Sequence, residues 1–264
     1  MSAMTNRLPT HHATTWGLLD LTGAPSEGPV AFRDELSPTA LFDAYRHGLF
    51  PFPASSPEQR FVHEIVSEAD VAAGLIQVFD GGDPYSVAWC SPDPRPVIFA
   101  ASARIQRSLR QQLRNKVVWT TTLDRAFERV VEQCRADRES QWLTDDLVNG
   151  VIGLREAGHA HSVEVWEGEE LVGGTFGVLV GGVFSADSQF TRRSGAGKVA
   201  VFDLMRRLAD AGGIAVDAQH DGAHARLLGA APIPRADYLA LLREHAGDPV
   251  VLSTDALPAA RLAA

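Results

Sequence analysis

The sequence predicts an α/β (α+β) fold, with a mixed, mainly antiparallel sheet in the C-terminal part and a smaller N-terminal lobe. Residues 162–166 alternate as a half-buried strand does, and residues 171–180 return as a second strand after a turn. Apolar residues then recur three or four apart along 199–209, which indicates one face of a helix. A short strand, 214–219, follows. Two returning strands and a crossover helix together predict a mixed sheet.

Polar side chains mark the strand ends on either side of that helix. Asp187 comes before the helix, and Asp217 and Gln219 come after it. Because residues two apart on a strand project from the same face, we expect Asp217 and Gln219 to lie side by side. Such strand ends can bring polar groups together around a ligand. Gly173 and Gly174 within the second strand predict a bulge, or the close approach of a ligand or another backbone.

The charge balance does not itself indicate a nucleic-acid partner. The chain of 264 residues carries a net charge of −9, whereas proteins that bind phosphate backbones are usually basic. Basic residues are nevertheless concentrated at helical spacing along one segment: Arg104, Arg107, Arg110, Arg114 and Lys116. This stripe is either a solvated helix face or an anion-binding one.

Several protein classes are disfavoured. Cys90 and Cys134 are far apart and lack CxxC spacing, so neither a disulfide scaffold nor a zinc site is indicated. His159 and His161 form an His-x-His pair, but no third ligand stands at a recognisable spacing, so a turn into the strand is favoured over a metal site. We see neither a signal peptide nor an apolar run near 18 residues, and predict a cytoplasmic protein without a membrane partner.

The predicted organisation has four parts. Residues 1–29 are predicted to form a loose arm, 30–100 a small lobe with an insert at 53–84, 101–250 the main domain and 251–264 a tail that is frayed from Asp255. In the lobe, Ser37 and Pro38 predict a helix start. Within the insert, residues 64–79 can be helical. The insert is either a tolerated surface insertion or an acceptor-binding lid.

Six short motifs carry a resemblance to a known family. In chain order they are GLFP (48–51), WCSPDPR (89–95), GHAHS (158–162), LVGG (171–174), DSQF (187–190) and DAQ (217–219). They fall in the order seen in leucyl/phenylalanyl-tRNA–protein transferases, which this chain resembles over roughly residues 36–242 as a divergent member. The resemblance implies a GNAT-like fold and the transfer of an aminoacyl group from aminoacyl-tRNA to a free amine, with no cofactor.

The resemblance also implies roles for particular residues. Asp217 and Gln219 match the pair that orients and deprotonates the acceptor amine, and Asp187 stands where the family has a Glu that helps bind the substrate's ammonium group. The basic positions that hold the tRNA match Arg107, Arg110 and Arg114. Substrate contacts are implied for Thr175, Phe176, Gln189, Phe190, Trp142 and Trp89.

Two departures from the family concern the side-chain pocket. Thr175 and Gln189 occupy positions where the family has Met in an apolar pocket for the Leu or Phe side chain. Hydrogen-bonding groups there penalise a purely aliphatic guest if they are buried without partners. Asp187 is one methylene shorter than the family's Glu, and active sites are sensitive to such displacements. The sequence therefore indicates that the substrate is less conserved than the reaction.

Other residues admit two interpretations. Trp142 can stack on the terminal adenosine of tRNA or pack in the core. Arg95 contacts substrate or forms a salt bridge that pins its turn, and the sequence favours the salt bridge. Residues 192–197 fit an Arg-x-x-Gly-x-Gly pattern, by which acyl-CoA transferases hold pyrophosphate at a helix N-terminus.

Three functions remain open from these observations. The favoured one is aminoacyl-tRNA-dependent transfer, either to a protein N-terminus or to a small-molecule amine. The second is acyl-CoA-dependent N-acyl transfer, which rests on residues 192–197. The third is a relative that binds charged tRNA without turnover.

Overall fold

The computed structural model describes residues 15–102, 104–136 and 141–263. The chain forms two compact units. Among these residues, the first unit contains 15–94, 141–160 and Pro234–Leu239, and the second contains the remainder. Each predicted domain is one continuous segment, whereas the first unit is assembled from three. The predicted domain boundaries themselves stay predictions.

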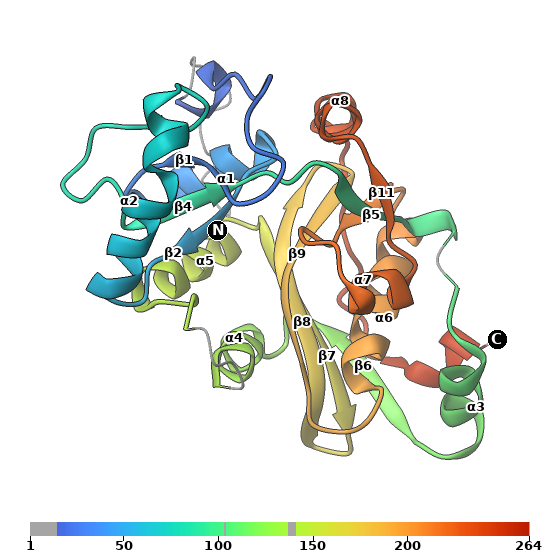
Figure 1. Ribbon diagram of the computed structural model, residues 1–264. Coiled ribbons are helices and arrows are strands. Elements are labelled where there is room, and N and C mark those ends of the chain that lie inside the picture. Colours follow the sequence, from blue (N-terminus) through green and yellow to red (C-terminus); the bar gives the residue numbers. More distant parts are fainter. Residues whose placement is uncertain (1–14, 103, 137–140, 264) are drawn as a thin grey trace, which may run out of the picture. The chain divides into compact units, whose positions relative to one another are not determined.

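The first unit has a sheet with the strand order β2-β4-β1-β3 (Figure 1). The strands are β1 (Pro29–Phe32), β2 (Phe50–Pro53), β3 (Gln77–Val78) and β4 (Val87–Cys90). β4 pairs antiparallel with β1 and β2, while β3 runs parallel to β1. The two prolines of β2 suit its place at the sheet edge, because proline has no N–H to give to a second neighbour.

Helix α1 (Pro38–Arg46) confirms the predicted start and end. The Ser37 hydroxyl accepts a hydrogen bond from Ala40 N, Pro38 occupies the first turn, and Gly48 follows the helix with φ +77°. α1 packs on α5 (Asp145–Glu156), where a Cβ on Gly150 would lie 2.3 Å from the Leu36 carbonyl oxygen. This close packing is why a distant segment joins the first unit.

The insert folds differently from the prediction. α2 spans Pro57–Ala72, starting seven residues before the predicted helix, because Ser56 caps it and Pro57 starts it. β3 follows and extends the sheet. The helix keeps four large apolar side chains more than half exposed: Phe61, Val62, Ile65 and Val66.

The N-terminal arm is anchored over its described part rather than loose. Trp16 is 1% exposed and packs on Trp89, with ring centroids 4.7 Å apart. Arg235 donates hydrogen bonds to the carbonyl oxygens of Ala24 and Pro25. Residues 1–14 lie outside the described residues.

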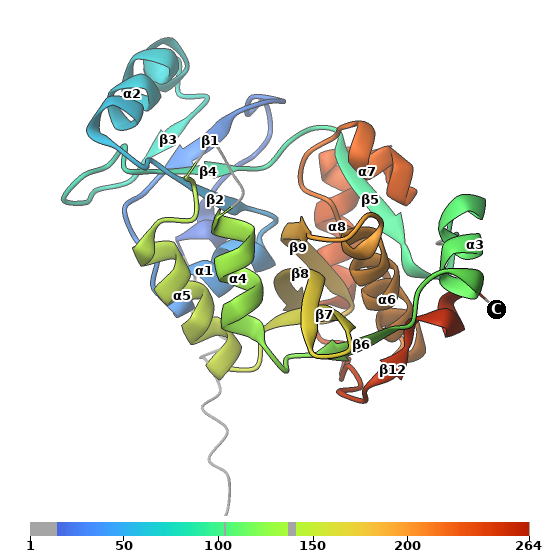
Figure 2. The same cartoon turned by 90° about the horizontal axis from the view of Figure 1, so that it is seen from below.

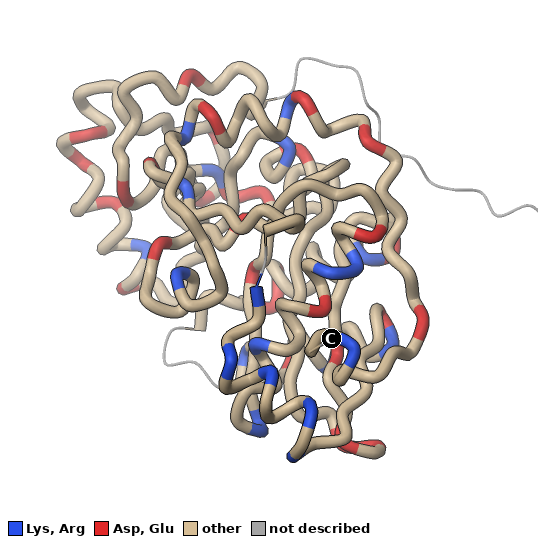
Figure 3. Tube along the Cα trace, turned by 90° about the vertical axis from the view of Figure 1, so that its right-hand side faces the viewer, with Lys and Arg blue, Asp and Glu red and all other residues tan. Residues whose placement is uncertain are grey.

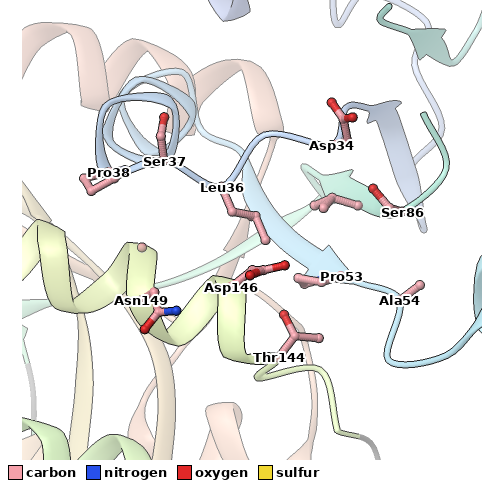
Figure 4. A pocket seen from close by; sticks show the side chains of 12 residues that line it. Asp34, Leu36, Ser37, Pro38, Pro53, Ala54, Ser86, Thr144, Asp146 and Asn149 are labelled. Carbon is pink, nitrogen blue, oxygen red and sulfur yellow. The ribbon is translucent and has the colours of Figure 1, made fainter. Parts of the chain in front are cut away.

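A cavity of about 440 Å³ lies within the first unit (Figure 4). Its lining comes from α1, β2, α5 and the loop after β1, and includes the carboxylates of Asp34 and Asp146. Asp34 Oδ2 accepts hydrogen bonds from the backbone of Gly82 and Asp83, which fixes the end of the insert. None of the predicted site residues lines this cavity.

The second unit contains an eight-stranded sheet in the order β11-β5-β10-β9-β8-β7-β6-β12. Its strands are β5 (Arg95–Phe99), β6 (Trp119–Leu123), β7 (Ala160–Glu167), β8 (Glu170–Val180), β9 (Val183–Thr191), β10 (Ala215–Asp217), β11 (Ala231–Ile233) and β12 (Leu257–Pro258). β9 and β10 are parallel, joined by α6 (Ala196–Asp210), while β8–β9, β5–β10 and β6–β7 are antiparallel. The predicted mixed, mainly antiparallel sheet is confirmed.

Helices cover both faces of this sheet. α6 lies against one face of β8 and β9, and α4 (Phe127–Ala136) lies against the other (Figures 1 and 2). β8 is therefore buried along nearly its whole length. At Gly173 an added Cβ would lie 2.6 Å from the Ala196 Cβ, which confirms the predicted close approach. The other helices associated with this unit are α3 (Arg107–Asn115), α7 (Ala223–Leu228) and part of α8 (Arg235–His245).

The C-terminal tail is part of the core rather than frayed. β12 pairs with β6, and the 3₁₀ helix η3 (Ala259–Ala263) buries its two end alanines. Inside α6, Asp203 and Arg207 form a buried ion pair at 2.6 Å. Arg207 also donates to the carbonyl oxygens of Ser253 and Asp255, which ties the tail to the helix.

Candidate active site

A buried ion pair stands at the end of β10. Arg95 begins β5 and Asp217 ends the antiparallel β10, so their side chains meet across the two strands. Arg95 Nε lies 2.8 Å from Asp217 Oδ1, and Nη2 lies 2.7 Å from Oδ2. Both side chains are at most 1% exposed. The predicted salt bridge of Arg95 is therefore confirmed, and its partner is one of the predicted site residues.

Asp217 is held ionised within this pair. Burial opposes its charge most strongly, but the Arg95 guanidinium and hydrogen bonds from Arg95, Gln219 N and Ser185 Oγ outweigh it and keep the pKa of the carboxyl below its usual value. The carboxylate oxygens thus have partners on all sides. Asp217 is placed to hold neighbouring groups rather than to accept a proton.

Gln219 does not continue the strand. β10 ends at Asp217, and Gln219 has φ +61° in the left-handed region, so the expectation that both side chains leave one strand face is wrong. Its backbone N–H donates to Asp217 Oδ1 at 2.8 Å, which holds the turn. A non-glycine residue in this region costs energy, and such residues cluster at functional sites.

The side-chain amide of Gln219 has a fixed orientation. Its Nε2 donates to Asp187 Oδ1 at 2.6 Å and to Ser185 Oγ at 3.2 Å. An ionised carboxylate only accepts hydrogen bonds, so the NH₂ end must face Asp187. Within the part of the chain that the structure describes, Gln219 Oε1 has no hydrogen-bond partner. This oxygen is therefore available to accept a hydrogen bond from a ligand.

Asp187 owes its position to a β-bulge. Phe176 pairs with Ser188 and Gly177 pairs with Ala186, so Asp187 is the extra residue of β9. A bulge re-aims a side chain and is common beside active sites. Gly177 faces the bulge closely, because a Cβ there would lie 2.0 Å from the Ser185 carbonyl oxygen.

A pocket of about 230 Å³ adjoins Asp187. The two predicted specificity positions, Thr175 and Gln189, both line it. Apolar lining side chains come from β5, α6, β10 and α7, namely Ile98, Val201, Val216 and Leu228. The Thr175 hydroxyl is buried and donates to the Ser188 carbonyl oxygen at 2.8 Å, so it has a partner within the protein.

Two histidines at this pocket were missed by sequence reasoning. His220 directly follows Gln219, and its pKa is lowered by desolvation and then by the Arg95 charge, against the opposing effect of Asp217. His224 on α7 contacts the Gln189 side chain, and desolvation, followed by the Lys198 charge, lowers its pKa. Both histidines follow closely after the DAQ motif (217–219), and this was the only sign in the sequence that they belong to the site. Nothing in the sequence showed that α7 folds over the pocket.

The four aromatic residues predicted to contact substrate are buried. Phe176 packs on Phe127 of α4, with ring centroids 6.1 Å apart, and Phe190 also lies under α4. Trp89 is 0% exposed and donates to the Arg33 carbonyl oxygen.

Trp142 stacks on Phe52 and is 6% exposed, which favours the core-packing interpretation. Both tryptophans belong to the first unit, and the substrate contacts of all four aromatic residues stay predictions.

The predicted tRNA-binding arginines lie on α3. Arg107, Arg110 and Arg114 are exposed, while Leu109 and Leu113 form the buried face of the helix. Figure 3 looks at the side that carries α3, where Lys and Arg gather in the lower part of the tube. Arg114 donates to the Ala263 carbonyl oxygen, so it also holds the tail. This surface is basic although the protein is acidic as a whole.

Packing accounts for the glycines of the Arg-x-x-Gly-x-Gly pattern. Gly195 has φ +90° at the start of α6, and a Cβ on Gly197 would lie 2.3 Å from Thr191 Oγ1 and 2.9 Å from the Phe190 carbonyl oxygen. Arg192 bonds to Gln133, and Arg193 pairs with Glu167 and Glu170. The pattern therefore has a structural explanation.

The two histidines of the His-x-His pair contact different partners. His159 stacks on Phe42, with ring centroids 3.7 Å apart, and His161 Nδ1 lies 2.7 Å from Asp124 Oδ2. Among residues 15–102, 104–136 and 141–263, no three His, Cys, Asp or Glu side chains come together as metal ligands. Over the same ranges, no helix is long and apolar enough to cross a membrane.

The second unit has a mixed sheet with one crossover helix beside the polar cluster. This is the architecture of GNAT-like acyltransferases, and the second unit belongs to that class. Residues 97–243 match the family described as leucyl/phenylalanyl-tRNA protein transferase. The chain belongs to this family and is an aminoacyltransferase.

Individual relatives match over most of their length. The leucyl/phenylalanyl-tRNA–protein transferase of Chromohalobacter salexigens is 38% identical over 237 residues, which cover 89% of this chain and 80% of the relative. That of Shewanella baltica (strain OS185) is 36% identical over 226 residues, covering 84% and 83%. That of Pseudomonas fluorescens (strain SBW25) is 36% identical over 225 residues, covering 84% and 87%.

Proposed function

We propose that this protein transfers an aminoacyl group from aminoacyl-tRNA to the free α-amine of a protein N-terminus. The names of its relatives support both substrates. The observation that carries the proposal is the open Oε1 of Gln219, held in place by Asp187 and Ser185. An acceptor of this kind can bind the N–H of an incoming amine.

The chemistry required is aminolysis of an ester. The lone pair of the acceptor nitrogen attacks the ester carbonyl carbon, the new C–N bond forms, and the bond to the ribose oxygen breaks. The nitrogen loses a proton and the ribose oxygen gains one, so the reaction balances without a cofactor. Because the ester is already activated, the enzyme chiefly positions the two reactants and favours the unprotonated amine.

In this proposal Gln219 is the catalytic residue and Asp217 is a positioning residue. Gln219 Oε1 accepts a hydrogen bond from the attacking amine, while Asp217 holds the turn through the Gln219 backbone N–H. Asp187 supplies the negative charge that attracts the ammonium group of the aminoacyl substrate, next to the pocket for its side chain. The exposed arginines of α3 bind the tRNA phosphates.

The apolar part of the pocket supports a Leu- or Phe-type side chain. Since the Thr175 hydroxyl is already bonded to Ser188, it does not require a partner from the guest. The acyl-CoA alternative loses its main support, because packing explains Gly195 and Gly197.

A transfer assay tests the proposal. tRNA charged with a mixture of labelled amino acids is offered with a peptide that has an N-terminal Arg or Lys, and we expect label on the peptide. Gln219→Ala should lower kcat by about 100-fold to 1,000-fold, as loss of one positioned hydrogen-bonding group does. Gln219→Glu, which keeps the shape but has no N–H to give Asp187, should be impaired as well.

Gln133→Ala, a glutamine on α4 outside the pocket, is the matched control and should keep full activity. Label on a small amine but not on the peptide would mean that the acceptor is a small-molecule amine and not a protein N-terminus. Full activity of Gln219→Ala would refute the catalytic assignment.

A further inference from the structure

Gln189 places a polar group in the lining of the side-chain pocket. It stands two residues beyond Asp187 on β9, a distance of about 6.6 Å along a strand. If Asp187 attracts the ammonium group, a side chain that extends into the pocket reaches Gln189 with its tip. A guest with a long or aromatic side chain therefore meets an amide there rather than an apolar wall.

The amide of Gln189 is held by His224. Gln189 Nε2 and His224 Nε2 are within hydrogen-bond distance, and since an amide nitrogen only donates, the imidazole nitrogen accepts. The lowered pKa of His224 favours the neutral ring that this requires. Gln189 Oε1 has no partner among the described residues. This oxygen is therefore available to a ligand.

The size and character of the pocket limit the guest. An apolar cavity of about 150 Å³ holds benzene, so a pocket of about 230 Å³ has room for a phenyl ring with a substituent. Ile98, Val201, Val216 and Leu228 suit the body of such a ring. A bound phenyl or isobutyl group would cover Gln189 Oε1 without replacing its contact with water, which costs binding energy.

We propose that Gln189, oriented by His224, makes the pocket select an aminoacyl group with an apolar body and a hydroxyl tip, which among the coded amino acids is tyrosine. The phenol O–H donates to Gln189 Oε1 while the ring packs on the apolar walls. This inference rests on the proposed function, because it concerns the side chain of the transferred group.

The test compares tRNAs charged with Tyr, Phe and Leu in the same transfer assay. We expect a kcat/KM for Tyr above that for Phe with the unmodified enzyme. Gln189→Met removes the acceptor oxygen and should lower the Tyr/Phe ratio by about twofold to tenfold, the effect of one hydrogen bond. Gln133→Met, outside the pocket, should leave the ratio unchanged. Transfer of Phe and Leu without Tyr would overturn the proposal.

A binding measurement separates this inference from the proposed function. The probes are 3′-amino-3′-deoxyadenosine carrying Tyr or Phe through a stable amide bond, titrated by calorimetry. Tighter binding of the Tyr probe, reversed in Gln189→Met, would uphold the inference even if no peptide were labelled. Equal or weaker binding of the Tyr probe would overturn it, and so would binding of neither probe.

Discussion

Arg95 donates two hydrogen bonds, of 2.8 Å and 2.7 Å, to the Asp217 carboxylate in the interior of the second unit. The pair joins β5 to β10, and Asp217 in turn fixes the backbone of Gln219. The Asp217 carboxylate therefore holds the turn that carries the side-chain amide of Gln219. In the proposed function, stability and activity therefore depend on the same contact.

Breaking this pair should destabilise the protein strongly. Asp217→Asn removes the carboxylate that accepts both hydrogen bonds from the buried Arg95, and losing one member of a buried pair costs about 3–5 kcal/mol of unfolding free energy. Urea unfolding measures the change. Arg193→Met, which breaks an ion pair half exposed to solvent, is the control and should cost less than about 1 kcal/mol. An equally small effect of Asp217→Asn would contradict the role assigned to the pair.

The same pair predicts how stability depends on pH. The folded pKa of Asp217 lies below its unfolded value of about 3.9, so its contribution is present above that pH and is lost as the pH falls through the lower folded value. We expect the difference in unfolding free energy between the unmodified protein and Asp217→Asn to shrink below about pH 4. A difference that stays constant down to pH 2 would show that Asp217 does not titrate in this way. The comparison cancels the effect of His224, whose pKa does not depend on Asp217.

Local signals allowed much of the fold to be predicted. The cap at Ser37 fixed the start of α1, and the spacing of Val199, Phe202 and Met205 identified the buried face of α6. Contacts between distant segments could not be predicted in this way. The burial of Trp16 and the pairing of β12 with β6 depend on surfaces that form only in the folded chain.

In the candidate site, too, some features could be predicted from the sequence and others depend on contacts between distant segments. The resemblance identified Asp187, Asp217 and Gln219, and the structure brings them together. The bulge at Asp187 depends on the register of β8 and therefore has no local signature. The left-handed turn at Gln219 is held by a bond to Asp217, two residues earlier, which is a local signal that the strand pattern of residues 214–219 obscured. Ser185, which links Asp217 to Gln219, stood in an ordinary strand pattern and was missed.

The exposed arginines of α3 should determine how tRNA binding responds to salt. Each phosphate contact contributes about −0.9 to the slope of log K against log salt concentration for a duplex. Arg107→Glu and Arg110→Glu should each weaken binding and lower the magnitude of the slope by about one. Filter binding over a salt series measures both quantities. Arg243→Glu, on α8, is the charge-matched control, and slopes that do not differ from it would exclude α3 from the tRNA-binding surface.

Substitution of Gly197 tests the structural explanation of the glycine pattern. A Cβ there would lie 2.3 Å from Thr191 Oγ1 and 2.9 Å from the Phe190 carbonyl oxygen, a backbone atom that cannot move aside easily. Gly197→Ala should therefore destabilise the protein by about 1–3 kcal/mol, the usual cost of overpacking. Gly247→Ala is the matched control, because nothing described lies within 4 Å of the added Cβ. Thermal unfolding with and without CoA measures both effects. Since the glycines serve packing, CoA should not raise Tm; a neutral Gly197→Ala together with stabilisation by CoA would favour acyl-CoA as the donor instead.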